Sequence, residues 1–150
     1  MLEHGDTVVD VGANIGMLSL AFANVVGNRG KVVTDFGGGD SASGVVVQSD
    51  GKIVVAGEGV GYPDGSRAYD FALARYLPDG RLDPSFGNRG RTLTGFGPGA
   101  DDYATGVALQ HDGKIVAAGV GAGIPLITSG RFAVARYDHN GHLDPTFGAG

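Results

Sequence analysis

A long segment of the chain occurs twice in tandem, and this repeat constrains the fold more than any other feature. Residues 27–57 read GNRGKVVTDFGGGDSASGVVVQSDGKIVVAG, and residues 87–119 read GNRGRTLTGFGPGADDYATGVALQHDGKIVAAG, with a two-residue insertion. Residues 71–87, FALARYLPDGRLDPSFG, return as FAVARYDHNGHLDPTFG at 132–148. Corresponding positions lie roughly 60 residues apart, a spacing that belongs to repeat architectures.

Asp-Gly and Asn-Gly dipeptides recur at matching places inside the repeat. QSDGK and QHDGK place Asp-Gly after an apolar run, and a second site has Asp79-Gly80 in one repeat and Asn140-Gly141 in the other. Because these dipeptides tolerate positive φ at both turn centres, they predict tight hairpin turns. Each repeat therefore reads as four short strands. The expected strands are 31–35, 44–48, 52–57 and 71–76 in the first repeat and 91–94, 106–110, 114–119 and 132–137 in the second.

The apolar content of these strands indicates how they pack. Runs such as GVVVQ and KIVVAG are almost continuously apolar, which is typical of strands buried on both faces. Four antiparallel strands with a buried face on each side form a propeller blade. We therefore expect a mainly β fold with two four-stranded antiparallel blade-like repeats, at 27–86 and 87–150, the second truncated at the start of a third.

Two blades leave open sheet edges, and open edges pair with other strands. Propellers contain about 4–8 blades. We expect that the chain either is part of a larger array, closed by further repeats, or self-associates to close a ring.

The repeated strings KVVTDFGGGD, DGKIVVAG and DFALARYLPDGRLDPSFG resemble the delta-60 repeat, a bacterial family of tandem units thought to build β-propellers. The resemblance covers about residues 27–150. It implies a non-enzymatic scaffold or binding module, often part of large secreted or cell-surface proteins. It implies no reaction and no catalytic residues.

The N-terminal residues 1–26 do not belong to the repeat. TVVDVG reads as a buried strand, GANIG as a turn and MLSLAFANVV as a helix, which together predict a Rossmann-like strand–helix unit. DTVVDVGANIG resembles motif I of FkbM-type S-adenosylmethionine-dependent methyltransferases, over residues 4–34. The resemblance implies that S-adenosylmethionine would lie against the glycine-rich turn. The cofactor-binding residues would be Asp10, Gly12, Asn14 and Gly16.

The chain departs from that family after this first unit. The family's spacing places its ribose-binding acidic residue at Phe36, and the adjacent Asp35 would point to the other face of a strand. Methyltransferase activity is therefore the alternative, while the leading expectation is a chain without enzymatic activity or cofactor. A fusion, a fragment or a sequence junction without evolved function would each give this pattern. We also expect that the helix at 17–25 could cover one sheet edge.

Composition excludes several other classes of function. The net charge of −5 and pI of about 5.1 give no electrostatic footprint for nucleic acid or an anionic membrane. The absence of cysteine excludes disulfides and thiolate metal sites. No apolar run approaches the ~20 residues of a membrane-spanning helix. MLEHGDTVV has no basic region or apolar core of a signal peptide, so the compartment stays undetermined.

Several polar residues have a functional and a structural interpretation. His139 and His142 flank a turn, and we expect exposed turn residues rather than metal ligands. The acidic loops 37–41 and 98–103 offer fewer oxygens than Ca²⁺ requires, so solvated turns and no metal are expected. Arg75 and Arg136 occupy one repeat position inside apolar strands. They could be functional, but structural pairs with the repeated Asp83 and Asp144 are the stronger expectation.

Recognition, if present, is expected in the loops that differ between the repeats. These are residues 58–70 and 120–131, and loops on a rigid scaffold often carry binding residues. The contact candidates are Tyr62, Arg67 and Tyr69. The alternative is that these loops vary because nothing constrains them.

Overall fold

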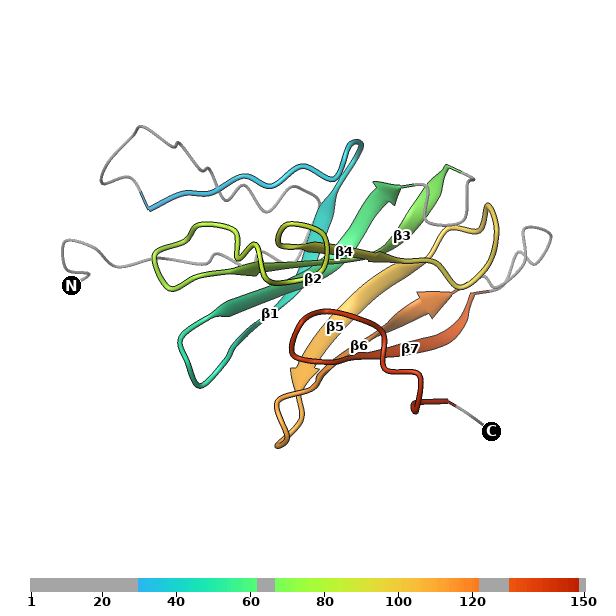
Figure 1. Ribbon diagram of the computed structural model, residues 1–150. Helices are drawn as coiled ribbons and strands as arrows, with labels where there is room; N and C mark the ends of the chain where they lie inside the picture. Colours follow the sequence, from blue (N-terminus) through green and yellow to red (C-terminus); the bar gives the residue numbers. More distant parts are fainter. Residues whose placement is uncertain (1–29, 62–66, 122–129, 149–150) are drawn as a thin grey trace.

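The computed structural model describes residues 30–61, 67–121 and 130–148, which form two antiparallel β-sheets (Figure 1). These ranges contain no helix, and thus none that could cross a membrane. The mainly β fold with two blade-like antiparallel sheets is therefore confirmed, while the N-terminal strand and helix and the helical cap lie outside the described residues. The first sheet has the order β1 (Ser41–Val47), β2 (Ile53–Gly61), β3 (Ala68–Tyr76) and β4 (Arg91–Thr94). The second has the order β5 (Tyr103–Leu109), β6 (Ile115–Gly121) and β7 (Arg131–Tyr137).

The fourth strand of the first sheet comes from the second repeat. β4 pairs with β3 in antiparallel register, with Phe71 opposite Thr94 and Ala74 opposite Arg91. The prediction that residues 91–94 belong to the sheet of their own repeat was therefore wrong. The first sheet thus takes its fourth strand from the second repeat, and the described part of the second sheet has three strands.

The predicted strand at residues 31–35 is not a strand in the structure. Its chain lies against the first sheet, where the Tyr76 hydroxyl donates a hydrogen bond to Thr34 Oγ1 at 2.8 Å. The Tyr137 hydroxyl donates to Thr94 Oγ1 in the same way at 2.9 Å. Residues 31–36 therefore lie against the first sheet as β4 lies against the second sheet. A strand needs a hydrogen-bonded neighbour, and within the described residues this segment has none.

The repeated Asp-Gly turns do connect β1 to β2 and β5 to β6, but their geometry differs from the expected one. Only the glycines have positive φ, 81° at Gly51 and 83° at Gly113. The Gly51 amide donates to the Gln48 carbonyl at 2.9 Å, and the Asp50 carboxylate accepts the Lys52 amide hydrogen bond at 3.1 Å. The aspartate therefore acts through its side chain, as in Asx turns, rather than through a left-handed backbone.

A β-bulge interrupts the first strand pair of each sheet and explains a glycine in each repeat. The register shifts between Ala42 and Gly44 in one sheet, and at the matching place in the other. A Cβ atom on Gly57 would lie 2.0 Å from the Ser41 carbonyl oxygen, and one on Gly119 would lie 1.9 Å from that of Tyr103. No side chain fits at that distance, so the bulge requires glycine at both positions.

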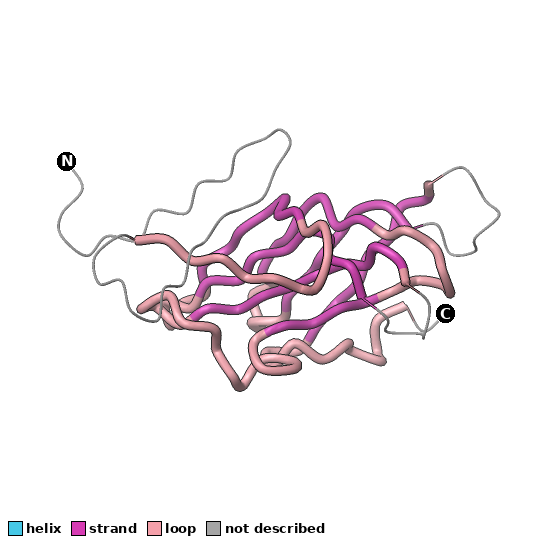
Figure 2. Tube along the Cα trace, turned by 90° about the horizontal axis from the view of Figure 1, so that it is seen from above, coloured by secondary structure: helices cyan, strands magenta, loops and turns pink. Residues whose placement is uncertain are grey.

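The main core lies between the two sheets. Phe71, Leu73 and Phe86 from the first repeat pack with Ile115 and Tyr137 from the second, and all five are buried. Figure 2 shows the strands of both sheets gathered in the middle of the molecule, with loops at both ends. Burying side chains of this size stabilises the fold by about 1.5–3 kcal/mol each, so packing of one sheet on the other contributes substantially to stability.

Candidate functional site

One group of charged residues is repeated and holds the turn after the third strand of the first sheet. Arg75 Nε lies 2.9 Å from Asp83 Oδ2, and Lys52 Nζ lies 3.3 Å from the same oxygen. The Ser85 hydroxyl donates to Asp83 Oδ1 at 2.6 Å. Burial alone would raise the pKa of Asp83, but the hydrogen bonds from Ser85 and the charge of Arg75 outweigh it and lower the pKa to about 2.

The second repeat builds the same network. Arg136 Nε lies 3.0 Å from Asp144 Oδ2, with Lys114 Nζ at 3.6 Å, and the Thr146 hydroxyl donates to Asp144 Oδ1 at 2.7 Å. Hydrogen bonds from Thr146 lower the pKa of Asp144 to about 2. The predicted arginine–aspartate pairs are thus confirmed. In both networks the charges are engaged with one another and hold the turn that follows the third strand of the repeat.

A second group of polar residues is not repeated and lies at one end of the two sheets, where β3 and β5 begin (Figure 1). The rings of Tyr69 and Tyr103 stack, with centroids 5.9 Å apart and planes at 29°. The Asp101 carboxylate accepts the Tyr69 amide hydrogen bond at 3.1 Å, and the Asp102 amide donates to the Tyr69 carbonyl at 2.6 Å. One tyrosine from each sheet is therefore fixed in a shared surface, which we call the loop-end patch (Tyr69, Tyr103, Asp101 and Glu58).

The electrostatics of the loop-end patch are those of crowded negative groups. Burial raises the pKa of Glu58, and the negative charge of Asp101 raises it further. Burial also raises the pKa of the Tyr103 hydroxyl, together with the charges of Asp101 and Glu58. A positive group bound at this surface would relieve that repulsion.

The loop-end patch is where the two repeats differ in sequence. Asp101 belongs to the two-residue insertion of the second repeat, so it has no counterpart in the first. Its neighbours in the loop-end patch have counterparts of unrelated chemistry. The counterparts are Ser41 for Tyr103, Gly130 for Tyr69 and Val120 for Glu58.

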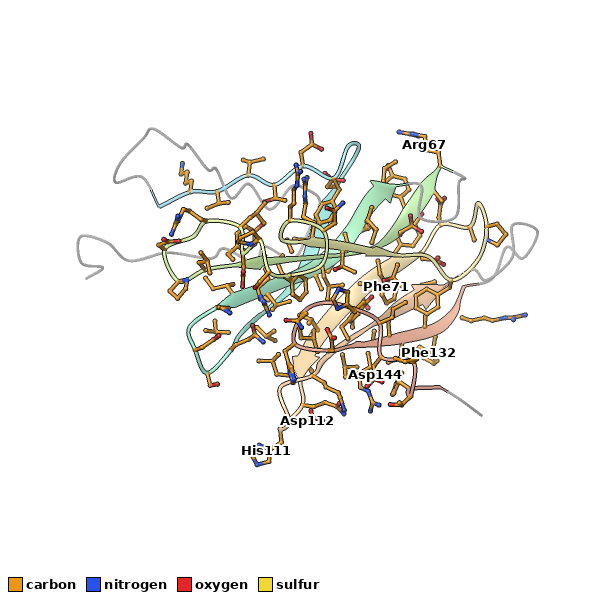
Figure 3. The ribbon with its side chains drawn as sticks, in the orientation of Figure 1. Arg67, Phe71, His111, Asp112, Phe132 and Asp144 are labelled. Atoms are coloured by element: carbon orange, nitrogen blue, oxygen red, sulfur yellow. The ribbon has the colours of Figure 1, made fainter. Side chains whose placement is uncertain are left out.

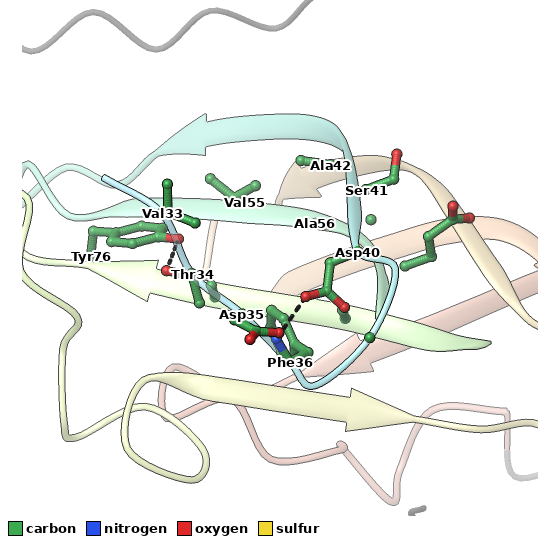
Figure 4. Close-up of a pocket in the computed structure, with 15 residues that line it drawn as sticks. Val33, Thr34, Asp35, Phe36, Asp40, Ser41, Ala42, Val55, Ala56 and Tyr76 are labelled. Carbon is green, nitrogen blue, oxygen red and sulfur yellow. Dashed lines mark hydrogen bonds between the residues drawn. The ribbon is translucent and has the colours of Figure 1, made fainter. Parts of the chain in front are cut away.

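A cavity of about 310 Å³ lies on the outer face of the first sheet, beneath residues 33–36 (Figure 4). Its floor is formed by small side chains of β1, β2 and β3, and the Tyr76–Thr34 hydrogen bond lies in its wall. Arg91 Nη1 donates to the Asp35 carbonyl at 2.6 Å and keeps the covering segment in place. The lining includes Phe36, Asp40, Ala42, Val55, Ala72 and Ala74.

Sequence reasoning identified part of the loop-end patch. Tyr69 is a member, and the exposed Arg67 directly precedes β3 (Figure 3), whereas Tyr62 lies outside the described residues. Tyr103 and Asp101 were missed, although the insertion in the second repeat was the signal that could have found them. The cofactor-binding residues of the methyltransferase interpretation also lie outside the described residues, and that interpretation stays a prediction. They are Asp10, Gly12, Asn14 and Gly16.

The two histidines of the last turn have different surroundings. His142 Nδ1 lies 3.4 Å from Asp138 Oδ2 on the surface. The exposed His139 offers its carbonyl oxygen to the Arg75 guanidinium. In the part of the chain that the structure describes, no three histidine or acidic side chains gather as metal ligands would.

The acidic loops are structural, so the prediction of solvated turns was wrong for their repeated aspartate. Asp40 Oδ2 accepts the Phe36 amide hydrogen bond at 2.7 Å, and Asp102 Oδ2 accepts that of Phe96 at the same distance. Asp102 is buried and Asp40 is half-buried. Each carboxylate closes the loop that leads into its sheet, which is why the residue recurs.

Comparison with known proteins agrees with this architecture. A family model described as a domain of unknown function (DUF5122) of β-propeller type matches residues 48–86 and 110–147. The two matches fall at equivalent parts of the two repeats and together span just over half of the chain. A search of curated proteins finds no match. The chain therefore belongs to the DUF5122 β-propeller family.

Proposed function

We propose that the chain is a non-enzymatic propeller-type scaffold that binds a partner through the loop-end patch. One observation carries this proposal: the stacked Tyr69 and Tyr103 unite two sheets in residues that the repeats do not share. The repeated charges, by contrast, are engaged in the scaffold. The delta-60 resemblance of residues 27–150 implies the same role.

The chemistry of the loop-end patch favours a positively charged partner. Glu58 and Asp101 supply negative charge, and the two tyrosine rings supply π faces. A lysine or arginine side chain over a tyrosine ring is attracted by about 0.5–2 kcal/mol, and carboxylates add to that attraction. A basic peptide segment of a partner protein would satisfy both features.

Two peptides of equal length and opposite charge test the proposal, with tyrosine fluorescence as the readout because the chain has no tryptophan. The lysine- and arginine-rich peptide should bind and the glutamate-rich one should not. Tyr103→Ser, which installs the counterpart from the first repeat, should weaken binding about tenfold, a loss of roughly 1.4 kcal/mol.

His111→Ser is the matched control, because Ser49 is its counterpart and His111 is exposed at a distant hairpin (Figure 3). It should bind the basic peptide like the unaltered chain. Equal binding of both peptides, no binding of either, or unaltered binding by Tyr103→Ser would overturn the proposal.

The alternative activity, an FkbM-type methyltransferase, rests on the resemblance of residues 4–34, whose candidate cofactor-binding residues lie outside the described ranges. It is tested by titrating the full chain with S-adenosylmethionine. Binding heat that disappears in Gly12→Val would support it, since a side chain there blocks the close approach of a cofactor to the backbone. Absence of heat at millimolar cofactor would remove it.

A further inference from the structure

The two sheets have equivalent faces, but among the described residues each sheet has a different face covered by the other sheet. The face of the first sheet that carries Phe71 and Leu73 packs on the second sheet and is buried. The equivalent face of the second sheet, here called the donor face (Val116, Ala118, Phe132 and Val134), lies on the outside. The exposed fractions are 103% for Phe132 and 43% for Val134, against 0% for both counterparts in the first sheet.

The opposite faces show the complementary difference. In the second sheet, Ala104, Ala117 and Ala135 are covered by the first sheet. In the first sheet the equivalent residues border the 310 Å³ cavity, which we call the acceptor cavity. They are Ala42, Val55 and Ala74.

The internal contact shows what would fit the acceptor cavity. Phe71 meets Phe96 edge to face, with ring centroids 4.9 Å apart. The counterparts of these two residues are Phe132, which is fully exposed, and Phe36, which lines the acceptor cavity. Placing the donor face of one copy on the acceptor cavity of another would therefore repeat a contact that the molecule already makes.

The sheet edges are complementary as well. Within the described ranges, no strand pairs with the outer edge of β7, and none pairs with residues 31–34, which lie against the first sheet. The pairing of β3 with β4 fixes the register that their counterparts would adopt. It places Phe132 opposite Thr34 and Ala135 opposite Lys31.

We propose that copies of this chain associate head to tail. The donor face of copy 1 fills the acceptor cavity of copy 2. Residues 31–34 of copy 2 then pair with β7 and become the fourth strand of the second sheet of copy 1. Such a contact is heterologous and closes when the rotation per copy completes a ring. Each copy supplies two blades, so a ring of about 4–8 blades contains two to four copies. The inference rests on the proposed scaffold role.

Solution mass, measured by light scattering over a hundredfold range of concentration, is the first test. The full chain should form a discrete species of two to four times 15.2 kDa. Phe132→Asp should weaken association at least a hundredfold, because it would place a charge in an apolar contact. His111→Asp adds the same charge at a hairpin tip far from Phe132 (Figure 3) and should assemble normally.

A mixing experiment tests the polarity of the contact. Ala42→Trp fills the acceptor cavity but leaves the donor face intact. Phe132→Asp disrupts the donor face but leaves the acceptor cavity intact. Each variant alone should be monomeric. Their mixture should give a 1:1 complex and nothing larger, because only one productive contact remains.

Hydrogen exchange measures the proposed pairing of residues 31–34 with β7 directly and needs no variant. Amides of residues 31–34 and 131–137 should become protected as concentration rises, while those of 106–109 should not change. A monomer at every concentration, assembly of Phe132→Asp like the unaltered chain, or no change at 31–34 would overturn the inference. Peptide binding at the loop-end patch involves residues of a single copy, so its failure would be separate from failure to assemble.

Discussion

Phe71 and Phe132 occupy the same position in two similar repeats, yet the first is buried and the second is fully exposed. Leu73 and Val134 differ in the same sense, as do Phe86 and Phe147. The residues themselves are alike in size and polarity, so the difference comes from what stands against each face. The first sheet has the second as its neighbour, whereas the described residues place nothing on the donor face.

Burial of equivalent side chains therefore depends on contacts between sheets more than on the sheet that carries them. Arrays of repeats are stabilised by the intrinsic terms of each unit and by the interface terms between neighbours. The same substitution in the two repeats should therefore have unequal effects. Such pairs are best compared in the monomer, at protein concentrations below assembly.

The largest contrast is expected for the two phenylalanines. Phe71→Ala should lower the free energy of unfolding by about 3–5 kcal/mol, because it leaves a cavity in the core between the sheets. Phe132→Ala should change it by less than about 0.5 kcal/mol, since none of the described residues covers that ring. Urea denaturation measures both values, and equal losses would show that the donor face is covered.

The arginine–aspartate networks should give the next contrast. Asp83→Ala removes one partner of a buried pair, whose side chains are each 4% exposed, and should cost about 3 kcal/mol. Asp144→Ala should cost less, because Arg136 is more exposed than Arg75. The comparison fails if chemical denaturation ranks the two variants in the reverse order.

The same carboxylates predict how stability depends on pH. The pKa of Asp83 and of Asp144 is lowered from its ordinary value of 3.8 to about 2. Their contribution is therefore present above about pH 4 and is lost as pH falls through 2. Unfolding free energies measured between pH 6 and 2 should fall less steeply in Asp83→Ala than in the unaltered chain, and parallel curves would contradict the assignment.

The smallest contrast concerns the tyrosines that hold the segments preceding each sheet. Tyr137→Phe removes a buried hydrogen bond to Thr94 and should cost about 1 kcal/mol. Tyr76→Phe removes the half-buried bond to Thr34 and should cost less. Thermal unfolding of the two variants side by side measures the difference, and a larger effect at Tyr76 would show that residues 31–36 are held more firmly than β4.

Much of the fold could be predicted because local signals repeat. The Asp-Gly pairs at 50–51 and 112–113 located the hairpins, and the apolar runs located the strands on either side, whereas Asp79-Gly80 and Asn140-Gly141 form turns that join no two strands of a sheet. The partner of β4 could not be predicted in this way, because residues 91–94 carry the same pattern whether they pair within their own repeat or with the preceding one. That choice is made by packing over long sequence distances, which no local string records.

The candidate site was less predictable for a related reason. Tyr69 could be found because it lies in a loop that differs between repeats. Tyr103 aligns with Ser41 across the insertion, but no sequence pattern shows that its ring stacks on Tyr69 of the other sheet. Geometry between two sheets, rather than any motif, creates the loop-end patch.

The pairing of β4 with the sheet of the preceding repeat has a mechanical consequence. The chain passes to the second sheet only after residues 91–94 have formed the last strand of the first sheet. The connection between the sheets therefore begins at a hydrogen-bonded strand. The free path between the sheets is residues 95–102, and the bond from the Asp102 amide to the Tyr69 carbonyl ties even that path down. The orientation of the second sheet relative to the first is therefore constrained by β4, which pairs with β3 and also contacts Tyr137 of the second sheet.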